Sequence, residues 1–148
     1  MIINTLFYFI LPWLIALFVI RIDIKIILVI APFAAIAANI LNTITVEYNW
    51  VDVTPYTFET NFESIPMVLG IIPVFSSIFI SIVINSQNDF RWFLVFSIVN
   101  TLIEWIFLWL GLARYTNGWN IGWTFVVYLV GYGSVYGYYR LLCRWKVI

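Results

Sequence analysis

One acidic side chain of this sequence falls inside a long apolar segment. Glu104 stands within LIEWIFLWL, and no basic residue is closer along the chain than Arg114. A charged carboxyl group at the centre of a lipid bilayer costs at least about 2.5–3.5 kcal/mol on insertion scales. We therefore expect Glu104 either to hold a proton or to accept hydrogen bonds from donors on other helices.

The polar residues around Glu104 have helical spacing. Ser97, Thr101 and Glu104 lie at positions i, i+4 and i+7, with Gly111 a further seven residues on, so they share one face of a helix. Small and polar residues line the contacts between helices in membranes. This face is therefore predicted to pack against protein, which directs Glu104 toward neighbouring helices rather than toward lipid.

Polar residues of two other apolar segments are expected at a similar depth. The candidate polar cluster comprises Glu104, Asn39, Asn42, Thr101, Thr124 and Tyr128. Two interpretations stay open. The cluster either lines a small cavity that opens to the outside, with Glu104 as a proton-linked or cation-binding group, or forms a closed hydrogen-bond network that fixes the register of the helices.

The composition indicates which elements must position these residues. Apolar residues make up 64% of the chain and charged residues 9%, whereas a soluble domain carries about 25% charge. An α-helix needs about 20 apolar residues to cross a bilayer. The segments of this kind are 2–20, 24–46, 65–84, 93–113 and 121–141. We predict an all-α polytopic membrane protein, a bundle of five transmembrane helices in which residues 1–148 form a single integral membrane domain.

The basic residues predict how this bundle is oriented. With five crossings, the 21–25 turn, the 85–92 loop and the C-terminus lie on the same side of the membrane. The basic residues on that side are Arg21, Lys25, Arg91, Arg140, Arg144 and Lys146. Only Arg114 lies on the other side. Because Lys and Arg in short loops are retained in the cytoplasm, the N-terminus is predicted outside and the C-terminus inside.

The longest connection, 47–64, contains acidic and aromatic residues and no basic residue. It is either a lid over the bundle that attracts a cation or a cationic ligand, or an interfacial loop whose aromatic side chains anchor at the lipid headgroups. Whether this loop re-enters the bilayer is left open.

Small residues in two segments predict close contacts between helices. The candidate packing residues are Gly70, Pro73, Ser77, Gly133 and Gly137. Pro66 and Pro73 predict a bent or locally broken third helix. Gly133 and Gly137 have the GxxxG spacing that lets helix backbones approach each other, within the chain or in a homo-oligomer.

Several kinds of chemistry lack the residues that they require. The sequence contains no histidine and one cysteine, Cys143, which argues against disulfide frameworks, zinc sites of the Cys/His kind and haem ligation by histidine. The formal net charge is zero, so an electropositive surface for nucleic acids is not supported. No cofactor, metal site or catalytic residue is predicted.

Three stretches of the chain are distinctive in combination: EWIFLWLGLARYTNGWNIGWTF, LVIAPFAAIAANILN and YYRLL. In them the chain resembles a family of small, multi-pass, functionally uncharacterised membrane proteins of spore-forming Gram-positive bacteria. The matching residues are Glu104, Trp105, Gly111, Tyr115, Gly118, Trp119, Asn120, Trp123, Tyr138, Tyr139 and Arg140. The resemblance spans most of the chain. It implies a bacterial cytoplasmic (plasma) membrane and brings no established activity.

Three classes of function follow from these observations. The leading prediction is a non-enzymatic accessory or assembly component in the lipid bilayer, which associates with itself or with another membrane protein. The second is a small transporter or ligand-binding protein that uses the outward polar cluster around Glu104. The third is a lipid-modifying enzyme with Glu104 as general acid or base, although no nucleophile–base pair and no phosphate-binding loop accompany that residue.

Overall fold

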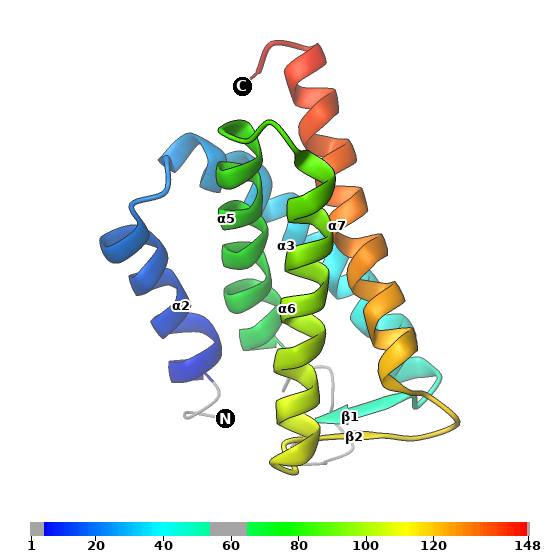
Figure 1. Cartoon of the computed structure of the whole chain (residues 1–148). Coiled ribbons are helices and arrows are strands. Elements are labelled where there is room, and N and C mark those ends of the chain that lie inside the picture. The colour runs from blue at the N-terminus through cyan, green and yellow to red at the C-terminus, as the bar shows by residue number, and fades with distance from the viewer. Residues whose placement is uncertain (1–4, 54–64, 148) are drawn as a thin grey trace.

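The structure, a computed structural model, describes residues 5–53 and 65–147. The chain is 80% helical, and the described residues form five helices. The helices lie side by side and run alternately in opposite directions, so that successive connections fall at opposite ends of the bundle (Figure 1). The prediction of an all-α fold is confirmed.

The elements follow one another with π-helical turns, written η, inside the first and third helices. Their bounds are η1 (Leu6–Ile10), α2 (Leu11–Leu14), η2 (Ile15–Ile20), α3 (Ile24–Glu47), β1 (Val51–Val53), η3 (Met67–Ile71), α5 (Ile72–Ile84), α6 (Asp89–Trp109), β2 (Ala113–Tyr115) and α7 (Ile121–Arg144). The first helix comprises η1, α2 and η2, and the third comprises η3 and α5.

Three helical segments among the described residues are long and apolar enough to cross a membrane. They are Ile24–Thr45, Met67–Ile84 and Asp89–Trp109. The first helix has a shorter apolar stretch, Leu6–Phe18. These segments are compatible with a membrane location, whereas the count of five crossings and their orientation stay predictions.

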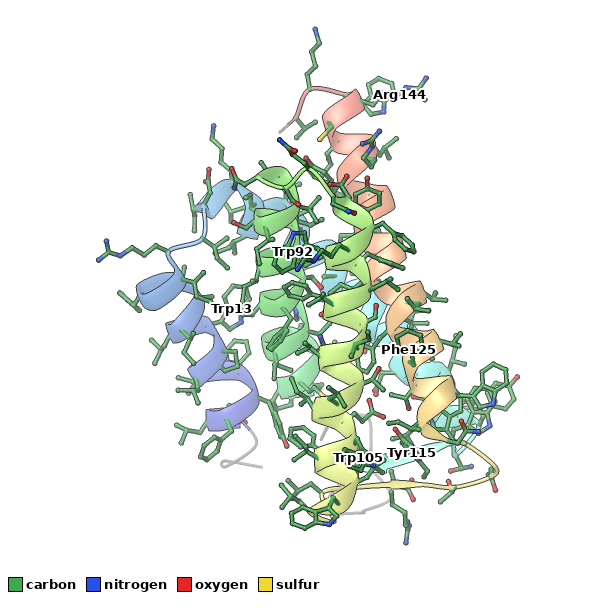
Figure 2. The ribbon with its side chains drawn as sticks, in the orientation of Figure 1. Trp13, Trp92, Trp105, Tyr115, Phe125 and Arg144 are labelled. Atoms are coloured by element: carbon green, nitrogen blue, oxygen red, sulfur yellow. The ribbon has the colours of Figure 1, made fainter. Side chains whose placement is uncertain are left out.

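The first and third helices meet where a proline interrupts the hydrogen bonding of the third. Pro73 has no N–H group to donate to the carbonyl oxygen of Leu69, four residues earlier. The indole Nε1 of Trp13 donates a hydrogen bond to that oxygen over 3.0 Å, from its place between the two helices (Figure 2). Next to it, Gly70 lies so close to the first helix that an added Cβ would come within 2.0 Å of the Tyr8 carbonyl oxygen. The third helix runs without interruption from Met67 to Ile84, so the predicted local break is absent from these residues and the segment around Pro73 instead contacts the first helix.

The fourth helix lies four residues earlier in the sequence than predicted. We expected residues 93–113, whereas α6 spans Asp89–Trp109. Asn88 fixes its start, because the Asn88 side chain accepts a hydrogen bond from a backbone N–H of the first turn, and Asp89 places negative charge at the positive end of the helix dipole. Gly111 follows its end with a φ of +69°, a left-handed conformation in which an α-helix does not continue.

The fifth helix begins at the predicted residue and ends later than predicted. Asn120 caps α7, since its side chain accepts a hydrogen bond from the backbone N–H of Gly122 over 2.9 Å. We expected an end at residue 141, whereas α7 continues to Arg144, a basic residue that suits the negative end of the helix dipole.

A two-stranded antiparallel sheet lies at the end of the bundle where α3 and α6 finish (Figure 1). Asp52 of β1 stands opposite Arg114 of β2, and their side chains form an ion pair of 2.7 Å. The sequence predicted one irregular loop over 47–64, so strand β1 corrects that prediction. Residues 54–64 of this loop, on which the lid and re-entrant alternatives rest, lie outside the described residues.

An aromatic cluster joins α5, α6 and α7 in the core. Phe79 is fully buried and contacts Phe96 and Tyr132 with ring centroids 5.4 Å and 5.2 Å apart. Phe96 and Tyr132 contact each other at 5.7 Å. Large aromatic rings bury the most apolar area per residue, so this cluster stabilises the packing of α6 against α7.

Candidate functional site

The carboxyl group of Glu104 accepts three hydrogen bonds from hydroxyl groups. Tyr115 Oη donates to Oε1 over 2.7 Å, and Thr124 Oγ1 donates to the same oxygen over 3.1 Å. Tyr128 Oη donates to Oε2 over 2.9 Å. All three donors are neutral side chains, and among the described residues Glu104 forms no ion pair.

Local structure brings these donors to α6. The chain turns back after Gly111 into β2, whose last residue is Tyr115, so the Tyr115 hydroxyl returns to the helix that it has just left. Thr124 and Tyr128 are four residues apart and therefore share one face of α7. That face packs against α6, the helix that carries Glu104.

A second layer of contacts holds the donors in place. Tyr115 Oη lies 2.6 Å from Thr124 Oγ1, and the indole Nε1 of Trp119 donates to Thr124 Oγ1 over 2.9 Å. The ring of Trp119 stacks on Trp50 at 4.7 Å, and Trp50 stacks on Tyr48 at 4.8 Å. The segment before β1 and the segment after β2 are thus packed together beside the Glu104 site.

Burial and the neighbouring carboxylate keep Tyr115 in its neutral form. Burial raises the pKa of the Tyr115 hydroxyl well above its ordinary value, and the negative charge of Glu104 raises this pKa further. At neutral pH Tyr115 is therefore a hydrogen-bond donor, as its contact with Oε1 requires.

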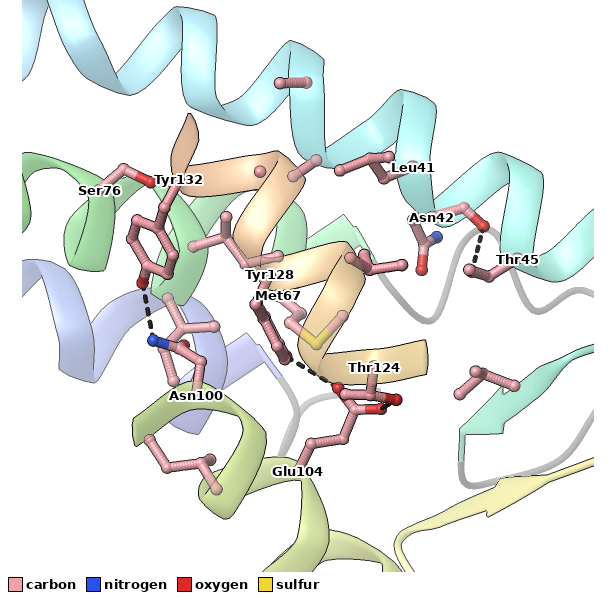
Figure 3. Close-up of a pocket in the computed structure, with 18 of the residues that line it drawn as sticks. Leu41, Asn42, Thr45, Met67, Ser76, Asn100, Glu104, Thr124, Tyr128 and Tyr132 are labelled. Carbon is pink, nitrogen blue, oxygen red and sulfur yellow. Dashed lines mark hydrogen bonds between the residues drawn. The ribbon is translucent and has the colours of Figure 1, made fainter. Parts of the chain in front are cut away.

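Glu104 lies in the wall of a partly open cavity of about 180 Å³ (Figure 3). The wall is built mainly by α3, the third helix, α6 and α7, and Tyr8, Val51, Ala113 and Trp119 complete it. Polar side chains at the wall include Asn42, Thr45, Asn100, Glu104, Thr124 and Tyr128. Much of the remaining wall is apolar and includes Ala34, Ala37, Ala38, Leu41, Ile103 and Phe107. The cavity therefore combines a small polar region with a larger apolar surface.

A second polar pair lies one helical turn from Glu104. Asn100 precedes Glu104 by four residues in α6, and Tyr132 follows Tyr128 by four residues in α7. Asn100 Nδ2 donates to Tyr132 Oη over 2.7 Å (Figure 3). The contact between α6 and α7 is therefore polar over at least two successive turns along the cavity.

Three of the predicted partners of Glu104 lie at the cavity with it. Thr124 and Tyr128 donate directly to its carboxyl group. Asn42 lines the same cavity from α3, although no hydrogen bond joins it to Glu104 among the contacts described above.

Two predicted members lie elsewhere. Asn39 is exposed and does not line the cavity. It follows the cavity residue Ala38, and one residue rotates about 100° around a helix, which turns Asn39 off the cavity face. Thr101 donates its hydroxyl hydrogen to the carbonyl oxygen of Ser97 over 2.8 Å, within its own helix, and also does not line the cavity.

The sequence did not predict the contribution of four residues. They are Tyr115, Trp119, Asn100 and Tyr132. Tyr115 and Trp119 belong to the connection after α6, for which no contact with Glu104 was predicted. Asn100 carried a usable signal, because it precedes Glu104 by four residues and an asparagine in an apolar segment needs a hydrogen-bond partner.

The predicted packing residues divide into two groups. Gly70, Pro73 and Ser77 are buried in the third helix, and Gly70 touches the first helix. In α7, an added Cβ on Gly133 would lie 3.7 Å from an aromatic ring of α6. Gly137 is exposed, and an added Cβ there would meet no atom within 4 Å. Within the chain, the close approach is therefore at Gly70.

The charge of the site limits what it can hold. Among the described residues, Glu104 is the one carboxyl group at the cavity wall, and no lysine or arginine lines it. Among the described residues, no group of three or more His, Cys, Asp or Glu side chains is arranged to hold a metal ion. A carboxyl group with neutral hydroxyl neighbours suits a ligand that donates hydrogen bonds or carries positive charge rather than an anion.

Comparisons of the chain with protein-family models, with functionally characterised proteins and with solved structures found no match. The family resemblance drawn from the sequence stays a prediction.

Proposed function

We propose that this protein is a small membrane-embedded binding protein whose ligand occupies the cavity beside Glu104. The observation that carries the proposal is a carboxyl group, held by three hydroxyl donors, in the wall of a largely apolar cavity of about 180 Å³. Ligand sites in proteins have this character, with predominantly apolar walls and a few polar groups that fix the orientation of the ligand.

The side chains of α3 at the cavity favour a role in binding. On α3 the wall is built from small residues, Ala34, Ala37 and Ala38. Larger apolar side chains at these positions would fill the space, so a wall of alanines suits a cavity that is kept for a ligand.

We further propose that all five helices cross the membrane, with the N-terminus outside and the C-terminus in the cytoplasm of a bacterium. The three apolar segments support a membrane location. The turn before α3, the loop before α6 and the end of α7 lie at one end of the bundle (Figure 1). Six of the seven basic residues belong to that end by sequence, which favours it as the cytoplasmic end.

This topology brings the site into the outer half of the bilayer. Glu104 lies five residues before Trp109, the last residue of α6, which corresponds to roughly 8 Å along the helix. A ligand that enters from the outer leaflet or the outer aqueous phase would therefore reach the carboxyl group after about one and a half helical turns.

The proposal is tested by filling the cavity. The protein is reconstituted in phosphatidylcholine nanodiscs and titrated with 2-phenylethanol, a neutral molecule with an apolar ring, while binding is followed by ligand-observed NMR. We expect Ala37→Leu to weaken binding, because the larger side chain occupies cavity volume. Ala35→Leu is the matched control, since Ala35 lies in the same helix but does not line the cavity. Equal binding by the two variants, or no binding above that of empty nanodiscs, refutes the proposal.

A second candidate function is an assembly component, as the sequence suggested. The observation in its favour is Gly137, which is exposed and has open space around it, so a second helix could approach α7 at this point. Gly137→Leu should then lower the fraction of oligomer measured by cross-linking in membranes. Gly137→Ala, a smaller change at the same position, is the control and should lower the oligomer fraction less. Gly133 is not used as a control because it faces α6 within the chain.

A further inference from the structure

We propose that the polar head of the ligand is a protonated amine, attached to an apolar body that lies along the cavity. This inference rests on the proposed function and specifies its ligand class. It follows from the charge of the cavity wall, from the hydrogen bonds that Glu104 already accepts and from the apolar remainder of the wall.

Positive charge is missing from the part of the cavity wall that the structure describes. There Glu104 contributes a carboxyl group, and no lysine or arginine is present. The hydrogen bonds of Glu104 come from neutral hydroxyl groups. Arg114, the nearest basic residue along the chain, forms its ion pair with Asp52 over 2.7 Å in the sheet, and its side chain is 59% exposed. A cationic ligand would supply the charge that the wall lacks.

The hydrogen bonds around Glu104 run from hydroxyl groups to the carboxyl oxygens. Tyr115, Thr124 and Tyr128 are donors toward the carboxyl oxygens, so Glu104 acts as an acceptor in all three contacts. An ionised carboxyl group only accepts hydrogen bonds, so in that form Glu104 suits these donors and attracts a cation.

The carboxylate has remaining capacity to accept hydrogen bonds, since each carboxylate oxygen accepts about two. The hydroxyl groups of Tyr115 and Thr124 share their two hydrogens between Oε1 and the 2.6 Å contact that joins them, and Tyr128 occupies one position on Oε2. One acceptor position is left on Oε2, which an ammonium N–H can fill. Charge-assisted hydrogen bonds of this kind are about twice as strong as neutral ones.

The rest of the wall defines the body of the ligand. Ala38 and Leu41 of α3 and Ile103 and Phe107 of α6 are among the apolar residues that line the rest of the cavity. The amine could be carried by a free hydrophobic molecule or by a lipid headgroup. We favour the free amine, because a phospholipid headgroup also brings a phosphate and the described residues of the cavity wall include no basic side chain to bind it.

The test compares three ligands of matched shape in the full-length protein. They are 2-phenylethylamine, 2-phenylethanol and 3-phenylpropionate, titrated at pH 7 into protein in phosphatidylcholine nanodiscs and followed by ligand-observed NMR. We expect the amine to bind at least about tenfold more tightly than the alcohol, because a hydrogen bond to a charged group exceeds a neutral one by this order. The carboxylate should bind most weakly. An alcohol that binds as tightly as the amine overturns the proposal, while the binding of the alcohol itself still reports on the cavity.

A substitution at Glu104 tests whether this residue causes the preference for the amine over the alcohol. Glu104→Gln keeps the size of the side chain and removes its negative charge, so the ratio of the amine affinity to the alcohol affinity should fall from at least about tenfold to about one. Retention of the preference in a variant with wild-type circular dichroism overturns the proposal. If Glu104→Gln does not fold, the comparison of the three ligands in the unaltered protein decides by itself.

Nanodiscs that contain phosphatidylethanolamine separate the two sources of the amine. We expect this lipid to leave the affinity for 2-phenylethylamine unchanged within about twofold. Competition that raises the apparent Kd in proportion to the lipid content, and that Glu104→Gln removes, would overturn the assignment to a free amine in favour of an aminolipid headgroup.

Discussion

Replacing Tyr115 by phenylalanine probes the link between the sheet and the Glu104 site. The substitution keeps the ring and deletes the hydroxyl group, which lies 2.7 Å from Glu104 Oε1 and 2.6 Å from Thr124 Oγ1. A hydrogen bond to a charged group contributes about 1.5–3 kcal/mol. Thr124 can still donate to Glu104, so the carboxyl group is not left without donors. We therefore expect the free energy of unfolding to fall by about 2 kcal/mol.

The assay is unfolding by SDS in mixed micelles, followed by circular dichroism. Tyr48→Phe is the matched control, because Tyr48 is exposed, stacks on Trp50 with its ring and uses its hydroxyl group in none of the described hydrogen bonds. Surface substitutions of this kind change stability by less than about 0.5 kcal/mol.

A double-mutant cycle separates the hydrogen bond from other effects of the ring. The free energies of unfolding are measured for Tyr115→Phe, Glu104→Gln and the double variant. Residues that share a hydrogen bond show coupling of about 0.5–3 kcal/mol, whereas independent sites add within about 0.3–0.5 kcal/mol. Additive effects, or a Tyr115→Phe variant as stable as Tyr48→Phe, would refute the assignment of this contact.

Three further predictions follow from the same contacts. Because the pKa of Tyr115 is raised in the folded protein, the unfolded chain loses the phenolic proton above pH 10 while the folded protein keeps it. The contribution of Tyr115 to stability is therefore present below pH 10 and falls as pH rises. In SDS unfolding at graded pH, Tyr115→Phe should reduce the decrease of the free energy of unfolding with pH by up to about 1.4 kcal/mol per pH unit. Trp13→Phe should lower the free energy of unfolding by about 1–3 kcal/mol, because it removes the donor that serves the carbonyl oxygen opposite a proline, whereas Trp105→Phe, at an exposed position, should change it little. Gly70→Ala should destabilise the protein by about 1–3 kcal/mol or prevent folding, because its Cβ meets backbone of the first helix, while Gly137→Ala, with open space around it, should be neutral or slightly stabilising; equal effects of the two would contradict the described contact between the first and third helices.

The helical elements of the site could be predicted from the sequence because each depends on local patterns. Runs of about 20 apolar residues predict the helices, and Asn120 before an apolar run predicts where α7 begins. The spacing of Thr124 and Tyr128 puts both on one face. These patterns were sufficient to expect donors from α7 near Glu104.

The predicted bounds of the fourth helix were wrong because they followed hydropathy alone, whereas residues at its two ends determine where it begins and ends. Residues 110–113 are apolar, so hydropathy alone extends the fourth helix to residue 113. The left-handed conformation at Gly111 ends it earlier and releases the chain into β2. The capping side chain of Asn88 likewise starts it before the apolar run.

The sequence by itself determined that Glu104 needs hydrogen-bond donors and which face of its helix it shares with Ser97 and Thr101. Only the tertiary structure decided which donors it receives, because Tyr115 reaches the carboxyl group through a strand whose partner, β1, lies about 60 residues earlier in the chain. Tertiary structure also decided that Asn42 lines the cavity and Asn39 does not. The choice depends on how α3 is rotated against α5 and α7, and packing between distant segments sets that rotation.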